Sequence, residues 1–211
     1  MRIEFPMKRC RGRPPMQRDG TNVTREALLR VGVELLTEKG FSATGIDEIL
    51  RRVQVPKGSF YHYFDSKEAF GSDLIDCYAS YFARKIDSFV LDASLTPLKR
   101  IRAFIADAKD GMARFNYERG CLVGNLGQEM GALPEAFRQK LINVFSDWQT
   151  RLENCLRAAR EAKEISAEVD CKQLAAYFWI GWEGAVLRAK LERSPLPLNV
   201  FENLFFAGLV R

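Results

Sequence analysis

The segment that decides the fold is Thr44-Gly-Ile-Asp-Glu-Ile-Leu-Arg-Arg-Val-Gln-Val-Pro-Lys-Gly-Ser-Phe-Tyr-His-Tyr-Phe64. Its first half is predicted to be a helix that starts at Thr44, which fits a capping box with Asp47. Pro56 does not fit inside that helix, so the chain turns there and a second short helix, 57–63, follows. Two short helices joined by a tight turn predict a helix-turn-helix, whose second helix can enter the major groove of DNA.

The second short helix is expected to have one face for the core and one for a partner. Phe60 and Phe64 lie one turn apart and should point to the interior. The opposite face can hydrogen-bond to phosphates or base edges. It carries Lys57, Ser59, Tyr61 and His62. Lys67, in the first turn of the next helix, is placed for a phosphate contact. Such a segment also occurs as an aromatic packing unit, so the pattern alone leaves both interpretations open.

The positive charge of the chain is concentrated at its beginning. The 211 residues carry a net charge of +5, and residues 1–67 hold 13 lysines and arginines against 8 acidic residues. The remainder is balanced, with 19 residues of each sign. A basic end on a neutral body is typical of a protein that meets a polyanion at that end. No apolar run is long enough to span a membrane and no signal peptide is recognisable, so we expect a cytoplasmic protein.

Cysteine and histidine usage argues against a conventional enzyme. The five cysteines are scattered, and neither a disulfide framework nor a zinc pattern is present. His62 is the only histidine and lies in the predicted DNA-reading helix. We therefore expect no metal and no other cofactor. An enzyme with Cys121 as its nucleophile is an alternative, but it would lack a histidine base.

The first 22 residues are expected to form a basic, flexible arm. They contain Arg11-Gly-Arg13-Pro14, which resembles the core of an AT-hook. Arg11 and Arg13 around a glycine suit the narrow minor groove of A·T-rich DNA, where the negative potential is strong. A basic tail can also serve solubility alone. An architectural DNA-bending protein is a further alternative, but the large neutral body does not fit it.

The rest of the chain is predicted to be helical, which gives an all-α fold class. A first helix begins at the N-cap Thr24, with Val23 and Leu28 as a hydrophobic staple, and ends at Gly40. Later helices are expected from the N-cap Ser66 to 91, over 95–114, from Pro134 to 163, from Asp170 to 192, and after Pro195 and Pro197 to 209. The Gly-rich stretch 120–131 is expected to be irregular. We divide the chain into a DNA-binding domain over 23–68 and a ligand-binding and dimerisation domain over 69–211.

Two segments of the second half combine glycines with polar or aromatic side chains, as expected beside a cavity. The first, 119–134, supplies Cys121, Asn125, Gln128 and Glu129. The second, 177–185, supplies Trp179, Trp182 and Glu183, with Lys190 further along the chain. Tryptophans, including Trp148, are more often core residues than ligand contacts. Glu183 inside an apolar helix needs a partner, which could be an arginine such as Arg188, the cavity or a dimer contact.

Two quoted stretches carry a family resemblance. Phe41-Ser-Ala-Thr44 and the run from Pro56 to Phe70 resemble the signature of TetR-family repressors, and the likeness covers the first 90 residues. It implies a TetR-like fold and a homodimer that binds a near-palindromic DNA operator. The residues that it places at or near DNA are Thr44, Lys57, Gly58, Ser59, Tyr61, His62 and Lys67.

Residues 119–134 and 178–192 resemble a subgroup of this family that responds to acrylate and, more distantly, its electrophile-sensing members. The likeness implies a repressor of genes for acrylate and dimethylsulfoniopropionate breakdown, released by acrylate or a related small molecule. Cys121 matches the reactive cysteine of the electrophile sensors and Lys190 its partner lysine, whose ammonium would favour a thiolate. Alternatively, Cys121 packs as a small apolar residue. The expected ligand set is Cys121, Asn125, Gln128, Trp148, Trp179, Trp182, Glu183 and Lys190.

The dimer is expected to form through the last two predicted helices. A strip of small residues would let another helix approach closely, and an apolar face would otherwise be exposed in a monomer. The strip consists of Gly181, Gly184 and Ala185, and the face consists of Leu198, Phe201, Leu204, Phe205 and Leu209.

Overall fold

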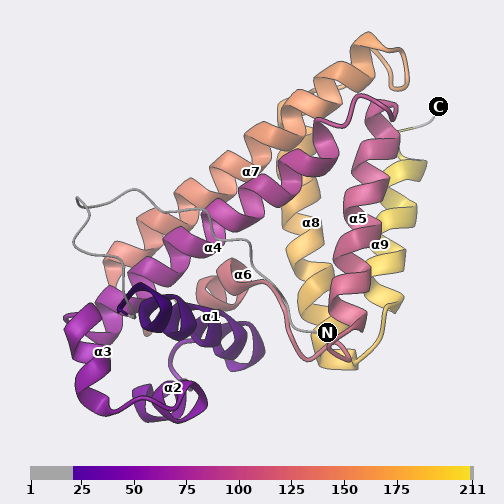
Figure 1. Ribbon diagram of the computed structural model, residues 1–211. Helices are drawn as coiled ribbons and strands as arrows, with labels where there is room; N and C mark the ends of the chain where they lie inside the picture. Colours follow the sequence, from indigo (N-terminus) through magenta and orange to yellow (C-terminus); the bar gives the residue numbers. More distant parts are fainter. Residues whose placement is uncertain (1–20, 210–211) are drawn as a thin grey trace.

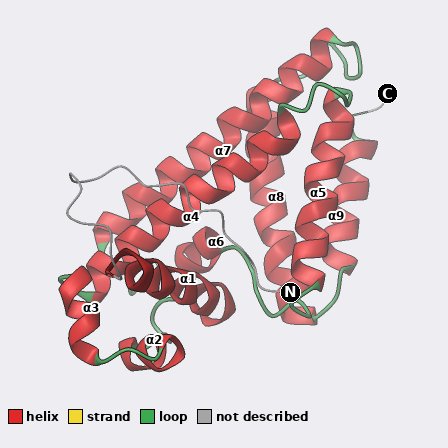
Figure 2. Ribbon diagram, in the orientation of Figure 1, coloured by secondary structure: helices red, strands yellow, loops and turns green. Residues whose placement is uncertain are grey.

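The computed structural model describes residues 21–209, and within that range the chain forms helices and no strands (Figure 2). The helices are α1 (Thr21–Lys39), α2 (Ile46–Val53), α3 (Lys57–Tyr63), α4 (Lys67–Val90), α5 (Pro97–Ala113), α6 (Leu122–Gln128), α7 (Glu135–Glu161), α8 (Cys171–Glu192) and α9 (Leu196–Ala207). The predicted all-α fold class is confirmed.

The helices form a small head and a larger body, which are connected by two long helices (Figure 1). Figure 1 shows α1, α2 and α3 together at one end, while α5, α8 and α9 lie side by side at the other. The long helices α4 and α7 pack along each other and reach from the head into the body. The short helix α6 contacts α1, α4 and α7, so it lies where head and body meet.

The head is held by an aromatic core. Phe60 of α3 is fully buried, and its ring centroid lies 5.2 Å from both Phe64 and Phe70. Leu28 and Leu36 of α1 are also buried there. The predicted inward direction of Phe60 and Phe64 is confirmed, and it leaves the other side of α3 to solvent.

The predicted start of the first helix is wrong. Helix α1 begins at Thr21, so Thr24 lies inside the helix and does not cap it. The side chain of Val23 is 70% exposed, so it forms no hydrophobic staple. The predicted end is confirmed: Gly40 follows the helix with φ of +83°, a left-handed conformation that favours glycine.

The predicted start of the second helix is also wrong. Helix α2 begins at Ile46 with Gly45 as its N-cap, and no side chain caps it. The hydroxyl of Thr44 instead donates to the backbone oxygen of Gly40 at 2.6 Å. Thr44 therefore closes the α1–α2 turn, and the capping box with Asp47 does not form.

The body follows the predicted pattern with two exceptions. Ser66 caps α4 and Asp170 caps α8, both by accepting backbone N–H groups, as predicted. The first exception is the last helix, which starts earlier than expected, because Pro195 is its N-cap and Pro197 lies in its first turn. The second exception is the stretch 120–131, which contains the helix α6. The Sγ atom of Cys121 accepts from the Gly124 N–H at 3.5 Å and caps this helix.

Candidate functional site

The exposed side of α3 is the candidate nucleic-acid interface. Lys57, Gly58, Tyr61 and His62 are exposed, and Ser59 is half-buried. The Tyr61 side chain is 50% exposed although aromatic, and its ring lies edge-on to Phe60. These side chains therefore stand on a helix whose opposite face is fixed in the core, which suits recognition of a rigid partner.

Two side chains expected at this surface are placed behind it. Thr44 is only 1% exposed, so its hydroxyl supports the turn and is not available to a partner, which corrects the expected DNA contact. The Lys67 ammonium donates to the backbone oxygen of Phe41 at 2.9 Å and lies 4.4 Å from the centre of the Phe41 ring. Partial burial lowers the pKa of Lys67. Lys67 thus holds the turn before α2, and its phosphate contact stays a prediction. Arg11 and Arg13 lie outside the described residues.

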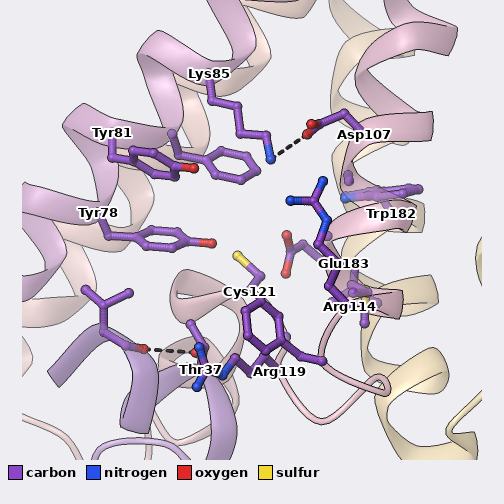
Figure 3. Close-up of a pocket in the computed structure, with 18 of the residues that line it drawn as sticks. Thr37, Tyr78, Tyr81, Lys85, Asp107, Arg114, Arg119, Cys121, Trp182 and Glu183 are labelled. Atoms are coloured by element: carbon purple, nitrogen blue, oxygen red, sulfur yellow. Dashed lines mark hydrogen bonds and ion pairs between the residues drawn. The ribbon is translucent and has the colours of Figure 1, made fainter. Parts of the chain in front are cut away.

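A cavity of about 650 Å³ lies in the body between α1, α4, α5 and α8 (Figure 3). Its aromatic walls include Tyr78, Phe82, Phe115 and Trp182. The sequence analysis pointed to Cys121, Trp182 and Glu183, and all three line this cavity. It overlooked the wall that α4 supplies, which comprises Tyr78, Tyr81, Phe82, Arg84, Lys85, Ser88 and Phe89. Their spacing of three and four residues on one helix face was a signal that could have found them.

Tyr78, Cys121 and Glu183 meet at one end of the cavity. Figure 3 shows the Cys121 sulfur between the Tyr78 hydroxyl and the Glu183 carboxylate. The carboxylate fits because residue 124 is glycine: a Cβ there would lie 2.1 Å from Glu183 Oε2. Glu183 was expected to face an arginine such as Arg188, the cavity or a dimer contact. It lines the cavity, and Arg188 pairs instead with Glu192 on the outer surface.

Burial decides the protonation of this group of three. Burial raises the pKa of Glu183 to about 7, and hydrogen bonding to Cys121 opposes that shift in part. Burial also raises the pKa of the Cys121 thiol well above its usual value, and the Glu183 charge adds to this shift. The pKa of Tyr78 is raised well above its usual value, first by burial and then by Cys121 and Glu183. The thiol is therefore protonated at neutral pH.

The expected pairing of Cys121 with Lys190 is wrong. The Lys190 ammonium donates to the backbone oxygen of Thr37 at 3.2 Å, and the charged group beside the thiol is the carboxylate of Glu183. A carboxylate disfavours a thiolate, whereas an ammonium would favour one. The charge beside Cys121 therefore lowers the share of reactive thiolate, whereas the expected lysine would have raised it.

The remaining expected ligand residues do not line the cavity of about 650 Å³. Trp148 and Trp179 are 0% and 2% exposed, and their ring centroids are 4.9 Å apart in the core, so the alternative of core packing holds for both. Asn125, Gln128 and Lys190 line a separate space of only about 10 Å³ behind Cys121 and Glu183. That space is smaller than a ligand, so these three are support residues for the cavity and not its walls.

Helix α6 links this end of the cavity to the head. Its residue Asn125 donates through Nδ2 to the backbone oxygens of Leu36 at 2.8 Å and Thr37 at 3.0 Å. The N–H of Gly120 and the ammonium of Lys190 also donate to Thr37. The last carbonyl groups of a helix lack partners within the helix. The body of the protein therefore caps the C-terminal end of α1.

A second set of contacts reaches the turn between α1 and α2. The carboxylate of Glu129 accepts the backbone N–H groups of Phe41 at 2.8 Å and Ser42 at 2.7 Å. Gly40 must be glycine here for space as well as conformation, because a Cβ would lie 1.8 Å from Glu129 Oε1. The sequence analysis named Glu129 only as a polar group near a cavity and missed this contact with a turn 87 residues away in the chain.

The outer surface of α8 and α9 carries an unpartnered apolar face. On α8 it consists of Tyr177, Ile180, Leu187 and Leu191, and on α9 of Leu196, Val200 and Leu204, each between 42% and 74% exposed. The face predicted from the sequence was partly wrong. Leu198, Phe205 and Leu209 are buried in the chain itself, and Phe201 packs over Gly181. Gly184 is open, with nothing near its Cβ position.

In the part of the chain that the structure describes, no helix combines the length and the apolar character that a membrane crossing requires.

A helix-turn-helix with one exposed recognition face, attached to a helical body with a ligand-sized cavity, defines the class of one-component transcriptional regulators.

Comparison with known proteins gives the family. The model described as bacterial regulatory proteins, tetR family, matches residues 28–70, and the model described as tetracyclin repressor-like, C-terminal domain, matches residues 97–205. The chain belongs to the TetR family. It is a transcriptional repressor of that family and not an enzyme, as the sequence predicted.

Its relatives agree with this assignment. The transcriptional regulator AcuR of Cereibacter sphaeroides is 54% identical over 95% of this chain and 91% of its own length. The repressor NemR of Escherichia coli K12 is 31% identical over 83% of this chain and 88% of its own length. A crystal structure of a regulatory protein TetR from Rhodobacter sphaeroides superposes with a TM-score of 0.88 at 54% identity, covering 89% of this chain and 100% of that one.

Proposed function

We propose that this repressor binds a near-palindromic operator as a homodimer in the cytoplasm and leaves it when acrylate occupies the cavity. The genes that it controls would then be those for acrylate and dimethylsulfoniopropionate breakdown, as the subgroup resemblance implies. In this proposal residues 23–68 read the DNA, and residues 69–211 bind the ligand and form the dimer. The arm 1–22 would add a minor-groove contact through Arg11 and Arg13.

One observation carries the proposal: Cys121 both lines the cavity and caps α6, the helix that holds the α1–α2 turn. A ligand against Cys121 therefore contacts the N-cap residue of the helix that positions the head. A ligand shifts a conformational equilibrium only by its difference in affinity for the two states. Movement of α6 would supply such a difference, because its contacts to Thr37 and Phe41 must lengthen or break.

The recognition surface fits two helices that enter successive major grooves. In a homodimer, α3 of each protomer would present Lys57, Ser59, Tyr61 and His62 to one half-site. The apolar face of α8 and α9 supplies the dimer contact, because a second copy would cover the same face on both chains. A large apolar patch on a soluble protein marks such an interaction site.

The test is release from DNA. The operator is first selected from random DNA with the full-length protein, and dissociation is then followed by fluorescence anisotropy while acrylate is added. We expect acrylate to lower operator affinity at least tenfold, and propionate, its saturated counterpart, shows whether the double bond matters. Anisotropy that stays unchanged at saturating acrylate would exclude acrylate as the inducer.

A second candidate function is electrophile sensing through Cys121. The observation in its favour is that the Cys121 sulfur faces the cavity beside Glu183, a carboxylate that can accept the thiol proton. In that reaction the thiolate sulfur bonds to the terminal alkene carbon of acrylate, and the proton held by Glu183 passes to the carbon beside the carboxylate. Mass spectrometry of the released protein separates the two candidates: an adduct on Cys121 supports the covalent route, and release without an adduct excludes it.

A further inference from the structure

The cavity is much longer than acrylate. The α4 residues that line it run from Tyr78 to Phe89, a distance of about 16 Å along the helix. Its volume of about 650 Å³ is that of a site for a drug-sized ligand. Acrylate would occupy a small part of this space and leave most of the lined surface in contact with water. A ligand that covers the α4 wall from Tyr78 to Phe89 must therefore be elongated.

The inner end of the cavity is built for a neutral acceptor. Burial raises the pKa of both groups there, Tyr78 and Glu183, so at neutral pH Tyr78 is protonated and Glu183, with a pKa of about 7, is protonated in about half of the molecules. A hydroxyl and a protonated carboxyl can each donate to a carbonyl oxygen. The burial that disfavours ionised Glu183 would also disfavour a second carboxylate beside it, and repulsion would add to this cost whenever Glu183 is ionised. The carbonyl of an amide or a thioester fits this end better than a free carboxylate does.

The middle of the cavity is apolar. Its apolar lining comprises Phe82 and Phe89 of α4, Met112 of α5, Phe115 just after α5, and Trp182 of α8. Figure 3 shows Trp182 and the aromatic rings of α4 on opposite sides of the space. An unbranched aliphatic arm would bury its surface between these walls.

The open side of the cavity is cationic. Of the four basic residues that line it, Lys85 pairs with Asp107, and Arg119 pairs with Glu34 and Glu38. The other two, Arg84 and Arg114, are not part of these ion pairs. Both are exposed, so they lie where the cavity meets solvent. The Arg114 guanidinium is directed into the cavity (Figure 3). Two such guanidinium groups suit a carboxylate or a phosphate.

We infer that the cavity binds an elongated acyl conjugate, with its neutral carbonyl against Tyr78 and Glu183, an apolar arm along α4, and an anionic group at Arg84 and Arg114. This inference rests on the proposed function, since it concerns the ligand of the same cavity. It differs from that function in the ligand class: acrylate carries its charge beside its double bond and can satisfy only one end of the site.

Calorimetric titration of the full-length protein with three probes tests the inference. The probes are propionate, N-hexylpropionamide and 6-propionamidohexanoate. N-Hexylpropionamide supplies the neutral carbonyl and the aliphatic arm, and 6-propionamidohexanoate adds a terminal carboxylate to them. All three are saturated, so Cys121 is not alkylated. We expect 6-propionamidohexanoate to bind at least about tenfold more tightly than propionate, because several methylenes are buried. We also expect it to bind several-fold more tightly than N-hexylpropionamide.

The double variant Arg84→Gln and Arg114→Gln should remove the advantage of 6-propionamidohexanoate over N-hexylpropionamide. Both positions are exposed, so the fold should be retained, which circular dichroism checks. Arg138→Gln, an exposed arginine of α7 paired with Glu135, is the matched control and should change nothing. The titration is repeated with S-propionyl-4′-phosphopantetheine, which carries a phosphate in place of the carboxylate. If the double variant loses more affinity for this probe than for 6-propionamidohexanoate, the anionic group is identified as a phosphate. If it loses less, the anionic group is identified as a carboxylate.

Equal affinity for propionate and 6-propionamidohexanoate would overturn the inference, and so would a preference that survives in the double variant. These results are independent of DNA release. If acrylate releases the operator while the conjugates bind weakly, the proposed function stands and this inference fails. If no ligand releases the operator but the conjugates bind as described, the inference about the ligand class stands and the proposed function fails.

Discussion

The carboxylate of Glu129 accepts hydrogen bonds from the backbone N–H groups of Phe41 and of its neighbour, at 2.8 and 2.7 Å. Glu129 follows the last residue of α6, and Phe41 lies in the turn between α1 and α2, the first helix of the helix-turn-helix. A charge-assisted bond to a backbone N–H is stronger than a neutral one. The position of the head thus depends on an acidic side chain of the body.

Replacing Glu129 by alanine should loosen this link. Loss of two charge-assisted hydrogen bonds should lower the free energy of unfolding by about 2 kcal/mol, measured by urea denaturation. The amount of acrylate needed for operator release should change as well, because the head no longer follows α6. Glu135→Ala removes an exposed carboxylate of α7 that contacts only Arg138 among the described residues, and it is the matched control. Equal stability of the two variants would contradict the role given to Glu129.

Gly124 should not tolerate a methyl group, whereas Gly127 in the same helix should. A Cβ at position 124 would lie 2.1 Å from Glu183 Oε2, and at position 127 it would meet nothing within 4 Å. We expect Gly124→Ala to lower the melting temperature and Gly127→Ala to raise it slightly, since alanine favours a helix by up to about 1 kcal/mol. Adding Glu183→Ala should rescue Gly124→Ala. A double variant as unstable as the single one would show that the carboxylate is not the obstacle.

Glu183 should make stability depend on pH. Its pKa is raised to about 7 in the folded protein from an ordinary value of 4.5, so the folded state holds a proton that the unfolded state releases. The stabilisation is therefore full below pH 4.5 and is lost as the pH rises towards 7, by about 3 kcal/mol at most.

The Glu183→Gln variant isolates this effect, because glutamine does not titrate. We expect the difference in unfolding free energy between wild type and variant to shift in favour of the variant between pH 5 and pH 8. Urea denaturation at several pH values measures it, and the comparison cancels the other titrating groups, which both proteins share. A difference that stays constant with pH would mean that Glu183 is ionised in the folded protein throughout.

The exposed residues of α3 should divide into general and sequence-reading contacts. We expect Tyr61→Ala to weaken binding to operator and to random DNA alike. His62→Ala and Lys57→Ala should reduce the preference for the operator, by about tenfold for a lost base contact. Anisotropy titrations with both DNAs measure these effects, with Arg138→Ala as the control. Equal losses on operator and random DNA from every variant would remove the assignment of base reading to α3.

Sequence reasoning succeeded where a local pattern decides the structure. Ser66, Asp170 and Gly40 mark helix ends through contacts with residues a few positions away. It failed at Thr44, whose hydroxyl donates to the backbone oxygen of Gly40 and does not cap α2. Both hydrogen bonds are local, and only packing selects between them.

The cavity was predicted less well for a different reason. Cys121 and Glu183 were found because a thiol and a carboxyl in apolar surroundings are conspicuous in a sequence. Lys190 was paired with the wrong partner, since its distance to Thr37 depends on how α8 crosses α1. Trp148 and Trp179 look like Trp182 in the sequence, and only the packing of α7 against α8 puts them in the core.

The apolar face of α8 and α9 should hold the dimer together. Ile180 is 73% exposed at the centre of this face, next to the open backbone at Gly184, so a charge at position 180 would be buried against the same face of the second copy. We expect Ile180→Glu to raise the dimer dissociation constant at least about tenfold in analytical ultracentrifugation and to weaken operator binding in parallel. Ile142→Glu is the matched control, because Ile142 is 50% exposed on α7, outside this face, and should leave the dimer intact. Both single variants should keep their helical circular dichroism, since neither side chain is buried in the monomer. If Ile180→Glu remains dimeric while Ile142→Glu dissociates, the dimer contact lies on α7 and not on α8 and α9.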